Sequence, residues 1–288
     1  VFIFGDTDVI KEKLTYEKIK TKFPNSHLVG SSSSGNILGN EISLSPVVAT
    51  AVKFESSRVE VQSIDYVEGA NLEQLSSELV NKLSRDGLKH VFILSDGLLV
   101  NGSELVKGIN SALENVEVTG GLAGDGARFQ ETFVICDDEP KQGKIAAIGF
   151  YGENLVISSG CFGGWSEFGA QRVITKSKNN ILYEIDNEPA LDLYKRYLGD
   201  YAKDLPSSGL RFPLSIKENE DDSEIIRTLL AIDEDAKSII FAGDVPEGYF
   251  ARLMKPDTDK LIDGAGQAAK EIVIANDKPA LGLVVSCV

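Results

Sequence analysis

Two loops rich in small residues hold most of the groups in this sequence that could bind a small molecule. The first loop, residues 30–35, reads GSSSSG, and its hydroxyls could present hydrogen-bond donors and acceptors to an anion or carboxylate. The second loop, residues 120–128, reads GGLAGDGAR and adds one acid, Asp125, and one base, Arg128. We expect Asp125 to accept a hydrogen bond from a ligand's ammonium group and Arg128 to pair with its carboxylate. The candidate ligand-binding residues of the two loops are Ser31, Ser32, Ser33, Gly121, Gly124, Asp125 and Arg128.

Neither loop has the pattern of a nucleotide-binding loop. Residues 30–35 lack the lysine of a Walker loop, and no strong helical pattern follows them. Residues 120–128 lack the order GxGxxG, and a β pattern follows instead of a helix. Each loop also has a purely structural interpretation. The first would be a tight turn where two backbones cross, and in the second Asp125 would cap its own turn.

A third run, residues 158–165, reads SSGCFGGW and contains the single tryptophan of the chain. We expect Cys161 and Trp165 to belong to the ligand site, with Trp165 as a lid over the pocket. Alternatively, Trp165 packs over the boundary between two domains. A nucleophilic Cys161 would need a nearby base to form its thiolate, and the sequence pattern places neither His27 nor His90 beside it.

The remaining reactive residues are few. Two histidines and three widely spaced cysteines without a CxxC motif disfavour a metal site, a Ser-His-Asp triad and a disulfide scaffold. A haem would need His27 or His90 as its axial ligand. Asp6 and Asp96 both follow apolar strands, where they could form an acid–base pair but more simply cap the next helix. We therefore expect no catalytic residues and no cofactor, and we predict that the protein is not an enzyme.

An internal repeat with an offset of 90 residues predicts how the two loops are placed. Residues 1–6 (VFIFGD) resemble residues 91–96 (VFILSD), and the same offset carries Gly30 onto Gly120. Each copy has the order strand, acidic turn, helical segment, strand and small-residue loop. Two equivalent loops should meet and line one cleft at the carboxyl ends of their strands.

Further β and helical patterns follow each copy. Hairpins are predicted for 47–52 with 58–64, 145–150 with 155–157, and 225–232 with 238–241. Helices are predicted near 8–23, 72–83, 103–113, 189–198 and 257–271, and a last strand at 280–285. The fold class is therefore α/β, with α+β possible, built of duplicated units and mixed sheets of hairpins with flanking helices. Pro189 is well placed to open a helix, so the predicted domains are residues 1–187 and 188–288.

Charge and composition exclude several classes of partner. The formal net charge of -15 repels nucleic acid and anionic membrane surfaces, so neither is expected as a partner. No apolar segment is long enough to span a membrane, and no signal peptide is visible. The cysteine usage fits a reducing, cytoplasmic setting. Both ends of the sequence lie inside strand patterns, so we expect that both are cut.

Taken together, these motifs resemble the FIST family, which consists of an N-terminal and a C-terminal FIST part. The runs that carry the resemblance are 28–35 (LVGSSSSG), 121–126 (GLAGDG), 160–161 with the strand 173–175, 188–191 (EPAL) to 197–199 (YLG), 212–214 (FPL), 240–248 (IFAGDVPEG) and 286–287 (SC). Their order covers essentially the whole chain. Relatives often carry cysteine where this chain has Ser31, which puts thiol chemistry of that loop in doubt here.

The resemblance implies a sensory, ligand-binding domain of signal-transduction proteins. The family is thought to bind small molecules, amino acids among them, either alone or fused to signalling modules. Some relatives bind haem and sense nitric oxide, and a eukaryotic branch is attached to an F-box. The leading hypothesis is thus a small-ligand sensor whose two halves shift for a downstream signalling protein to read. The alternatives are a haem-based gas sensor, a hydrolase that uses Cys161 or a loop serine, and a scaffold without ligand.

Overall fold

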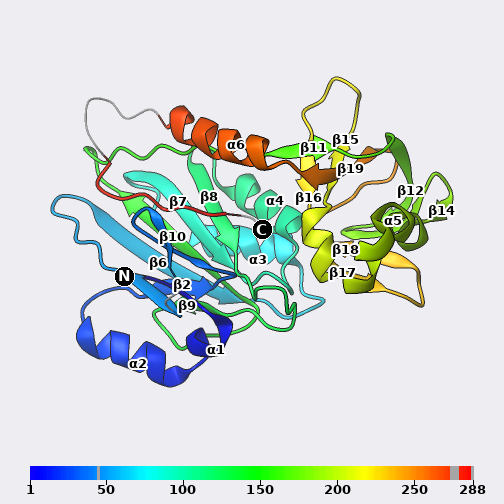
Figure 1. Ribbon diagram of the computed structural model, residues 1–288. Coiled ribbons are helices and arrows are strands. Elements are labelled where there is room, and N and C mark those ends of the chain that lie inside the picture. Colours follow the sequence, from blue (N-terminus) through cyan, green and yellow to red (C-terminus); the bar gives the residue numbers. More distant parts are fainter. Residues whose placement is uncertain (44–45, 273–278, 287–288) are drawn as a thin grey trace. The chain divides into compact units, whose positions relative to one another are not determined.

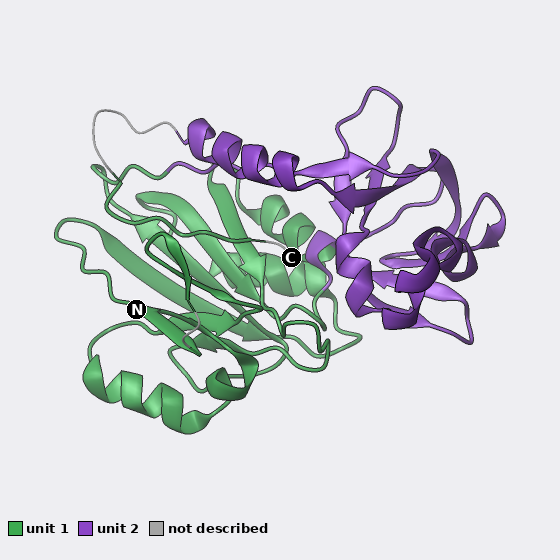
Figure 2. Ribbon diagram, viewed as in Figure 1, with its two compact units in different colours: residues 1–100, 104–157, 279–287 green, residues 101–103, 158–278, 288 purple. Residues whose placement is uncertain are grey.

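The structure is a computed structural model that describes residues 1–43, 46–272 and 279–286 (Figure 1). The chain forms two compact units (Figure 2). Unit 1 comprises Val1–Val100, Glu104–Ile157 and the described residues of Pro279–Cys287, and unit 2 comprises Asn101–Ser103 and the described residues of Ser158–Lys278. Each unit combines helices with strands, so the predicted mixed α/β class is confirmed.

Unit 1 contains two four-stranded sheets, with the strand orders β5-β1-β2-β9 and β6-β10-β7-β8. Each sheet has one parallel pair, β1 with β2 and β7 with β8, and its other pairs are antiparallel. The strands are β1 (Phe2–Gly5), β2 (Val29–Ser32), β5 (Val47–Thr50), β6 (Arg58–Asp65), β7 (Leu88–Ser95), β8 (Glu117–Leu122), β9 (Val134–Cys136) and β10 (Lys144–Tyr151). A small hairpin, β3 (Asn36–Leu38) with β4 (Glu41–Ser43), follows the serine loop.

The two sheets of unit 1 are stacked between helices in four layers. Phe92 and Leu94 of β7 pack into a core shared with the first sheet, whereas Val91 and Ile93 pack into a second core with helical side chains. A third core joins Ile3 of β1 to the helices on the outer face of the first sheet. This arrangement explains why β7 is apolar from Val91 to Leu94, because both of its faces are covered there. The helices are α1 (Thr7–Ile10), α2 (Lys13–Lys22), α3 (Leu72–Asn81) and α4 (Gly102–Ala112).

The two parallel strand pairs have equivalent registers. Ile3 faces Gly30 across β1 and β2, and Ile93 faces Gly120 across β7 and β8, an offset of 90 on both sides. A Cβ atom at Gly30 would overlap the carbonyl oxygen of Ile3, and one at Gly120 would overlap that of Ile93. The repeated glycines thus serve the close approach of two strands. Duplication of the complete units stays a prediction.

Two of the three predicted hairpins are wrong. The strands at 47–50 and 58–65 follow one another in the chain, but β5 pairs with β1 and β6 pairs with β10, so they lie in different sheets. Residues 155–157 form no strand. The predicted last strand is also absent from the described residues 279–286, and Cys287 lies outside the described residues.

Unit 2 is built around one antiparallel sheet with the order β16-β15-β19-β12-β13-β18-β17, to which β11 and β14 add at β19 and β13. The predicted third hairpin is confirmed in part: β17 pairs with β18, whereas residues 225–227 of its first arm form β16, which pairs with β15. The strands are β11 (Trp165–Glu167), β12 (Arg172–Lys178), β13 (Ile181–Ile185), β14 (Glu188–Pro189), β15 (Leu214–Lys217), β16 (Ile225–Arg227), β17 (Leu229–Asp233), β18 (Ser238–Phe241) and β19 (Phe250–Pro256). The helices are α5 (Ala190–Leu198), α6 (Thr258–Glu271) and the short 3-10 helices η1 (Gly199–Asp204) and η2 (Ser207–Arg211).

Helix α5 lies where the sequence predicts a helix, and its ends have clear causes. Pro189 stands just before its first turn, and Gly199, with φ of 57°, ends it. Leu193 and Tyr194 on its inner side are buried in the core of unit 2. Helix α6 also has a clear start: Asp257 caps it by accepting a hydrogen bond from the Lys260 amide at 3.2 Å.

Candidate functional site

The serine loop continues β2, and its hydroxyls bond mostly to the chain itself. Ser31 and Ser32 are the last residues of β2 and are buried. The Ser32 Oγ accepts a hydrogen bond from the Phe133 amide at 3.0 Å. The Ser33 hydroxyl donates to Oδ1 of Asn36 at 2.8 Å, at the start of the small hairpin. These hydroxyls therefore hold the loop in place.

The structure brings the serine loop and the glycine loop into contact. The Gly124 amide donates to the carbonyl oxygen of Ser32 at 3.0 Å, and the Gly126 amide donates to Oγ of Ser34 at 3.1 Å. A Cβ at Gly124 would stand 2.5 Å from the Ser34 Oγ, so a side chain there would separate the loops. The junction lies at the carboxyl ends of β2 and β8, as the repeat predicts. That the two loops line a cleft stays a prediction.

Asp125 is the centre of the glycine loop, and its side chain is only 2% exposed. Its Oδ1 accepts hydrogen bonds from Nε and a terminal nitrogen of Arg128 at 3.0 and 2.6 Å. Its Oδ2 accepts from the amides of Gln130 and Glu131 at 3.1 and 3.2 Å. Burial opposes ionisation, but the neighbouring Thr7 hydroxyl, these amides and Arg128 outweigh it and hold the pKa of Asp125 below its ordinary value.

Arg128 bridges two carboxylates. Besides Asp125 it donates to Oδ2 of Asp8 at 2.7 Å. The hydrogen bonds to Asp8 and Asp125 raise the pKa of its guanidinium. A ligand that used the Asp125 carboxylate would have to exchange hydrogen bonds that already exist, which limits the net gain. The geometry thus gives the glycine loop a structural role as a closed turn.

Gly121 contacts a segment that is distant in sequence. A Cβ atom at this position would stand 2.9 Å from Cγ1 of Val285, in the described segment 279–286 of the same unit. Gly121 thereby makes room for the C-terminal segment beside β8. No feature of the glycine loop by itself indicates this contact.

The third predicted run, residues 158–165, belongs to unit 2, whereas the serine and glycine loops belong to unit 1. Cys161 is exposed in an irregular segment, and Trp165 begins β11, where it pairs with Pro256 of β19. A Cβ at Gly160 or Gly164 would overlap the backbone of α6. The glycines of this run therefore serve its close packing on that helix.

The reactive side chains of unit 1 are engaged by their own chain. His27 Nδ1 lies 2.5 Å from Oδ2 of Asp137. His90 is buried, its Nε2 lies 2.8 Å from the hydroxyl of Thr119, and burial lowers its pKa although Glu117 opposes the effect. A haem could not approach His90 without local rearrangement, because the residue is only 3% exposed and its Nε2 lies against Thr119.

Two further groups have structural explanations. Asp96 is buried and accepts hydrogen bonds from the amides of Leu98, Leu99 and Gly143 at 2.8–2.9 Å. It therefore holds a turn and does not cap the following helix as predicted. Burial raises the pKa of the Cys136 thiol to about 11, so this cysteine stays protonated at neutral pH.

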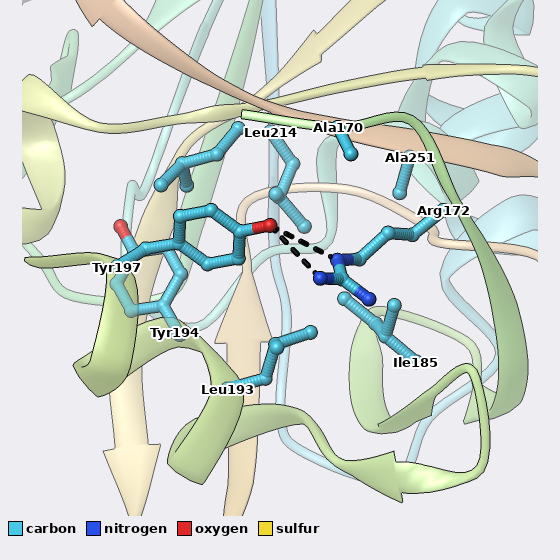
Figure 3. A pocket seen from close by; sticks show the side chains of 9 residues that line it. Ala170, Arg172, Ile185, Leu193, Tyr194, Tyr197, Leu214 and Ala251 are labelled. Carbon is cyan, nitrogen blue, oxygen red and sulfur yellow. Dashed lines mark hydrogen bonds between the residues drawn. The ribbon is translucent and has the colours of Figure 1, made fainter. Parts of the chain in front are cut away.

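Sequence reasoning missed a hollow in unit 2 with a volume of about 20 Å³ (Figure 3). Its lining is apolar except for one guanidinium and two tyrosines. The side chains come from strands β12, β13, β15 and β19, from helix α5 and from the turn before β12: Arg172, Ile185, Leu214, Ala251, Leu253, Leu193, Tyr194, Tyr197 and Ala170. By volume the hollow holds a water molecule or a group of similar size.

Arg172 is the charged residue at this hollow. Its Nε and one terminal nitrogen donate to the hydroxyl of Tyr197 at 3.1 and 3.0 Å, as Figure 3 shows. Its other terminal nitrogen donates to Oδ2 of Asp186 at 2.8 Å. Tyr197 and then Asp186 raise the pKa of this guanidinium, which therefore stays charged. Its side chain is 30% exposed, so it reaches both the hollow and solvent.

Comparison with known families agrees with the order of the motifs along the chain. The FIST N domain matches residues 1–188, and the FIST C domain matches residues 190–288. The chain belongs to the FIST family. FIST domains are in general sensory domains of signal transduction. The two FIST parts meet at 188–190, whereas the compact units divide between Ile157 and Ser158.

A relative of this FIST protein is MJ1623, an uncharacterized protein of Methanocaldococcus jannaschii. The two are 21% identical over 283 residues, which is 91% of this chain and 55% of the relative. The chain thus spans about half the length of that relative. In the part of the chain that the structure describes, no helix is long and apolar enough to cross a membrane.

Proposed function

We propose that this FIST protein is a sensory domain that binds a small ligand in the hollow beside Arg172 of unit 2. The observation that carries the proposal is the combination of an apolar lining with one charged group that is fixed by Tyr197 and Asp186. Small-molecule sites typically combine a mostly apolar surface with a few placed polar groups. Because the hollow holds only about one water-sized group, one end of the ligand enters it, and the rest of the ligand lies outside against the partly exposed Arg172.

Helix α5 would convey the signal. Three lining residues, Leu193, Tyr194 and Tyr197, lie on this helix, so an occupied hollow changes what its inner side contacts. A ligand shifts an equilibrium between two states only by its difference in affinity for them. Contact with three residues of one helix is a direct source of such a difference. A downstream signalling protein, in the cytoplasm on this proposal, would then respond to the position of α5.

An amino acid held by the serine and glycine loops is the rival location for the same function. In its favour, the loops meet at the carboxyl ends of two parallel strand pairs, where α/β sheets commonly bind ligands. Against it, the Ser32 hydroxyl oxygen and both carboxylate oxygens of Asp125 already have partners in the chain. At the hollow beside Arg172, the apolar lining makes no hydrogen bonds that a ligand would have to replace. The geometry therefore favours this location.

A thermal-shift screen with amino acids and small organic acids tests the function and its location. Ala170 lines the hollow but is exposed, so Ala170→Leu should fill it without disturbing the core. Ala265→Leu, on the exposed part of α6, is the matched control. We expect a ligand that raises the melting temperature of the wild type and of Ala265→Leu but not of Ala170→Leu. Stabilisation that survives in Ala170→Leu and is lost in Ser32→Ala would place the site at the loops.

We also propose that the protein acts without a cofactor and without covalent catalysis. Of the two histidines, His27 is the one that fits a haem ligand better, because it is 52% exposed and Asp137 orients its ring. A haem titration of the wild type and of His27→Ala checks this, and a Soret band lost in the variant would contradict the proposal. Broad thiol and serine-hydrolase probes check the second part. Specific labelling of Cys161 or a loop serine would establish a nucleophile.

A further inference from the structure

We infer that the ligand of the hollow is a monocarboxylate with a short apolar tail, gripped by Arg172. The inference rests on the proposed function, because it assigns a chemical class to the ligand of the same hollow. It follows from the donors of one guanidinium, the anion already beside it, and the apolar lining behind it.

Arg172 keeps two N–H donors for a ligand. A guanidinium carries five N–H groups, one on Nε and two on each terminal nitrogen. Nε and one terminal nitrogen each donate once to Tyr197, and the other terminal nitrogen donates once to Asp186. Among the described residues, each terminal nitrogen therefore has one N–H without an acceptor. Two N–H groups on neighbouring nitrogens match the two oxygens of a carboxylate.

The partners of Arg172 hold its plane in a fixed orientation. Asp186 is itself fixed, because its Oδ1 accepts a hydrogen bond from the Val173 amide at 2.9 Å while its Oδ2 accepts from Arg172. On the edge away from Asp186, Nε and one terminal nitrogen of Arg172 both donate to the Tyr197 hydroxyl. A guanidinium that is positioned before the ligand arrives loses less entropy on binding. The grip is thus preorganised by one carboxylate and one hydroxyl.

Charge limits the ligand to a single negative charge. Asp186 already neutralises part of the Arg172 charge, and the whole chain carries a formal net charge of -15. A phosphate or a dicarboxylate would meet the repulsion of both. A monocarboxylate gains the bidentate contact at the smallest cost in repulsion.

The apolar lining selects what is attached to the carboxylate. Ile185, Leu193, Leu214 and Leu253 surround the hollow with aliphatic carbon, and a polar tail would lose its hydration there without a partner. With a volume of about 20 Å³, the hollow accepts only the terminal methyl group of a tail while Tyr197 keeps its place, so the tail must be short. Butanoate fits this description, and butanamide is its neutral match.

Calorimetric titration of the full chain with butanoate, butanamide and α-aminobutanoate tests the inference. We expect butanoate to bind at least tenfold more tightly than butanamide and to lose at least tenfold in affinity in Arg172→Gln. Lys176→Gln, a charge-matched change on the same strand, should bind as the wild type does. Tyr197→Phe keeps the guanidinium and removes only its hydroxyl partner, so it should still prefer butanoate to butanamide.

The outcomes separate the inference from the proposed function. If butanoate and butanamide bind equally and Ala170→Leu abolishes both, the hollow is a ligand site but the carboxylate assignment is wrong. If neither binds, or if binding survives in Ala170→Leu, both the inference and the proposed location are overturned. If α-aminobutanoate binds at least as tightly as butanoate and depends on Arg172, the carboxylate grip is supported and extends to amino acids.

Discussion

Arg172 of β12 and Tyr197 of α5 are joined by two hydrogen bonds, from Nε and a terminal nitrogen of the guanidinium to one hydroxyl, at 3.1 and 3.0 Å. This pair links a strand of the unit 2 sheet to the helix packed on it, at the mouth of the hollow. It makes α5 sensitive to anything that competes for Arg172.

The first prediction concerns the stability of this link. Tyr197→Phe removes the hydroxyl, and we expect the free energy of unfolding to fall by about 0.5–1.5 kcal/mol, as for an ordinary hydrogen bond. Tyr201→Phe changes a tyrosine that is largely exposed and should be nearly neutral. Urea unfolding of both variants checks this. Equal stability of Tyr197→Phe and the wild type would show that the link contributes little.

The second prediction concerns the close approach of the parallel strands. Gly30→Ala and Gly120→Ala should each destabilise unit 1 by about 1–3 kcal/mol, because the new Cβ overlaps a carbonyl oxygen. Gly35→Ala is the control, since a Cβ there would meet nothing within 4 Å. Chemical denaturation of the three variants gives the comparison. A loss of stability in Gly30→Ala without one in Gly120→Ala would contradict the equivalence of the β1–β2 and β7–β8 strand pairs.

The pKa of Asp125 leads to the third prediction. Because this pKa is held below its ordinary value of 3.8, the ionised carboxylate stabilises the fold above that pH, and the stabilisation is lost as the pH falls through the lower, folded-state pKa. Asp125→Asn should therefore be much less stable than the wild type near neutral pH. The gap should narrow in acid, as the pH falls below 3.8. A gap that does not change with pH would mean that the carboxylate charge is unimportant.

The pKa of His90 leads to the fourth prediction. Here, in contrast to Asp125, the fold disfavours the charged form of the side chain. Burial lowers its pKa below the ordinary value of 6.5, so the unfolded chain binds a proton more readily than the folded protein does. Stability should be unaffected above pH 6.5 and should fall as the pH drops below it. In His90→Gln this part of the pH dependence should disappear. Stability measured across this range in both proteins decides the matter.

Local sequence patterns predict part of the fold well. The glycines at 30 and 120 and the apolar strand at 91–94 are determined by what lies next to them in the sheet, and the repeat makes this visible. The turn between 50 and 58 looks like a hairpin turn, yet it connects two sheets. Sheet membership depends on pairing with β1 and β10, which lie far away in the chain. Periodicity within one segment carries no information about such partners.

The hollow could not be predicted for a related reason. Its lining comes from five separate strands and helices, and Arg172 stands in the sequence RVITKSK without a recognisable motif. The loops at 30–35 and 120–128, by contrast, attract attention through their composition. Their contact with one another follows from the repeat, but their internal hydrogen bonds do not. A composition rich in glycine and serine is thus compatible with closed structural turns as well as with ligand binding.

Methyl NMR of the full chain during titration with butanoate tests most directly whether the hollow binds a ligand. The account predicts saturable shifts for the methyl groups of Leu193, Leu214 and Leu253, which line the hollow. The methyl signals of Leu122, which ends β8 within the glycine loop, should not shift. Saturable shifts at Leu122 without shifts at the hollow, or no saturable shift at any methyl group, would contradict the account.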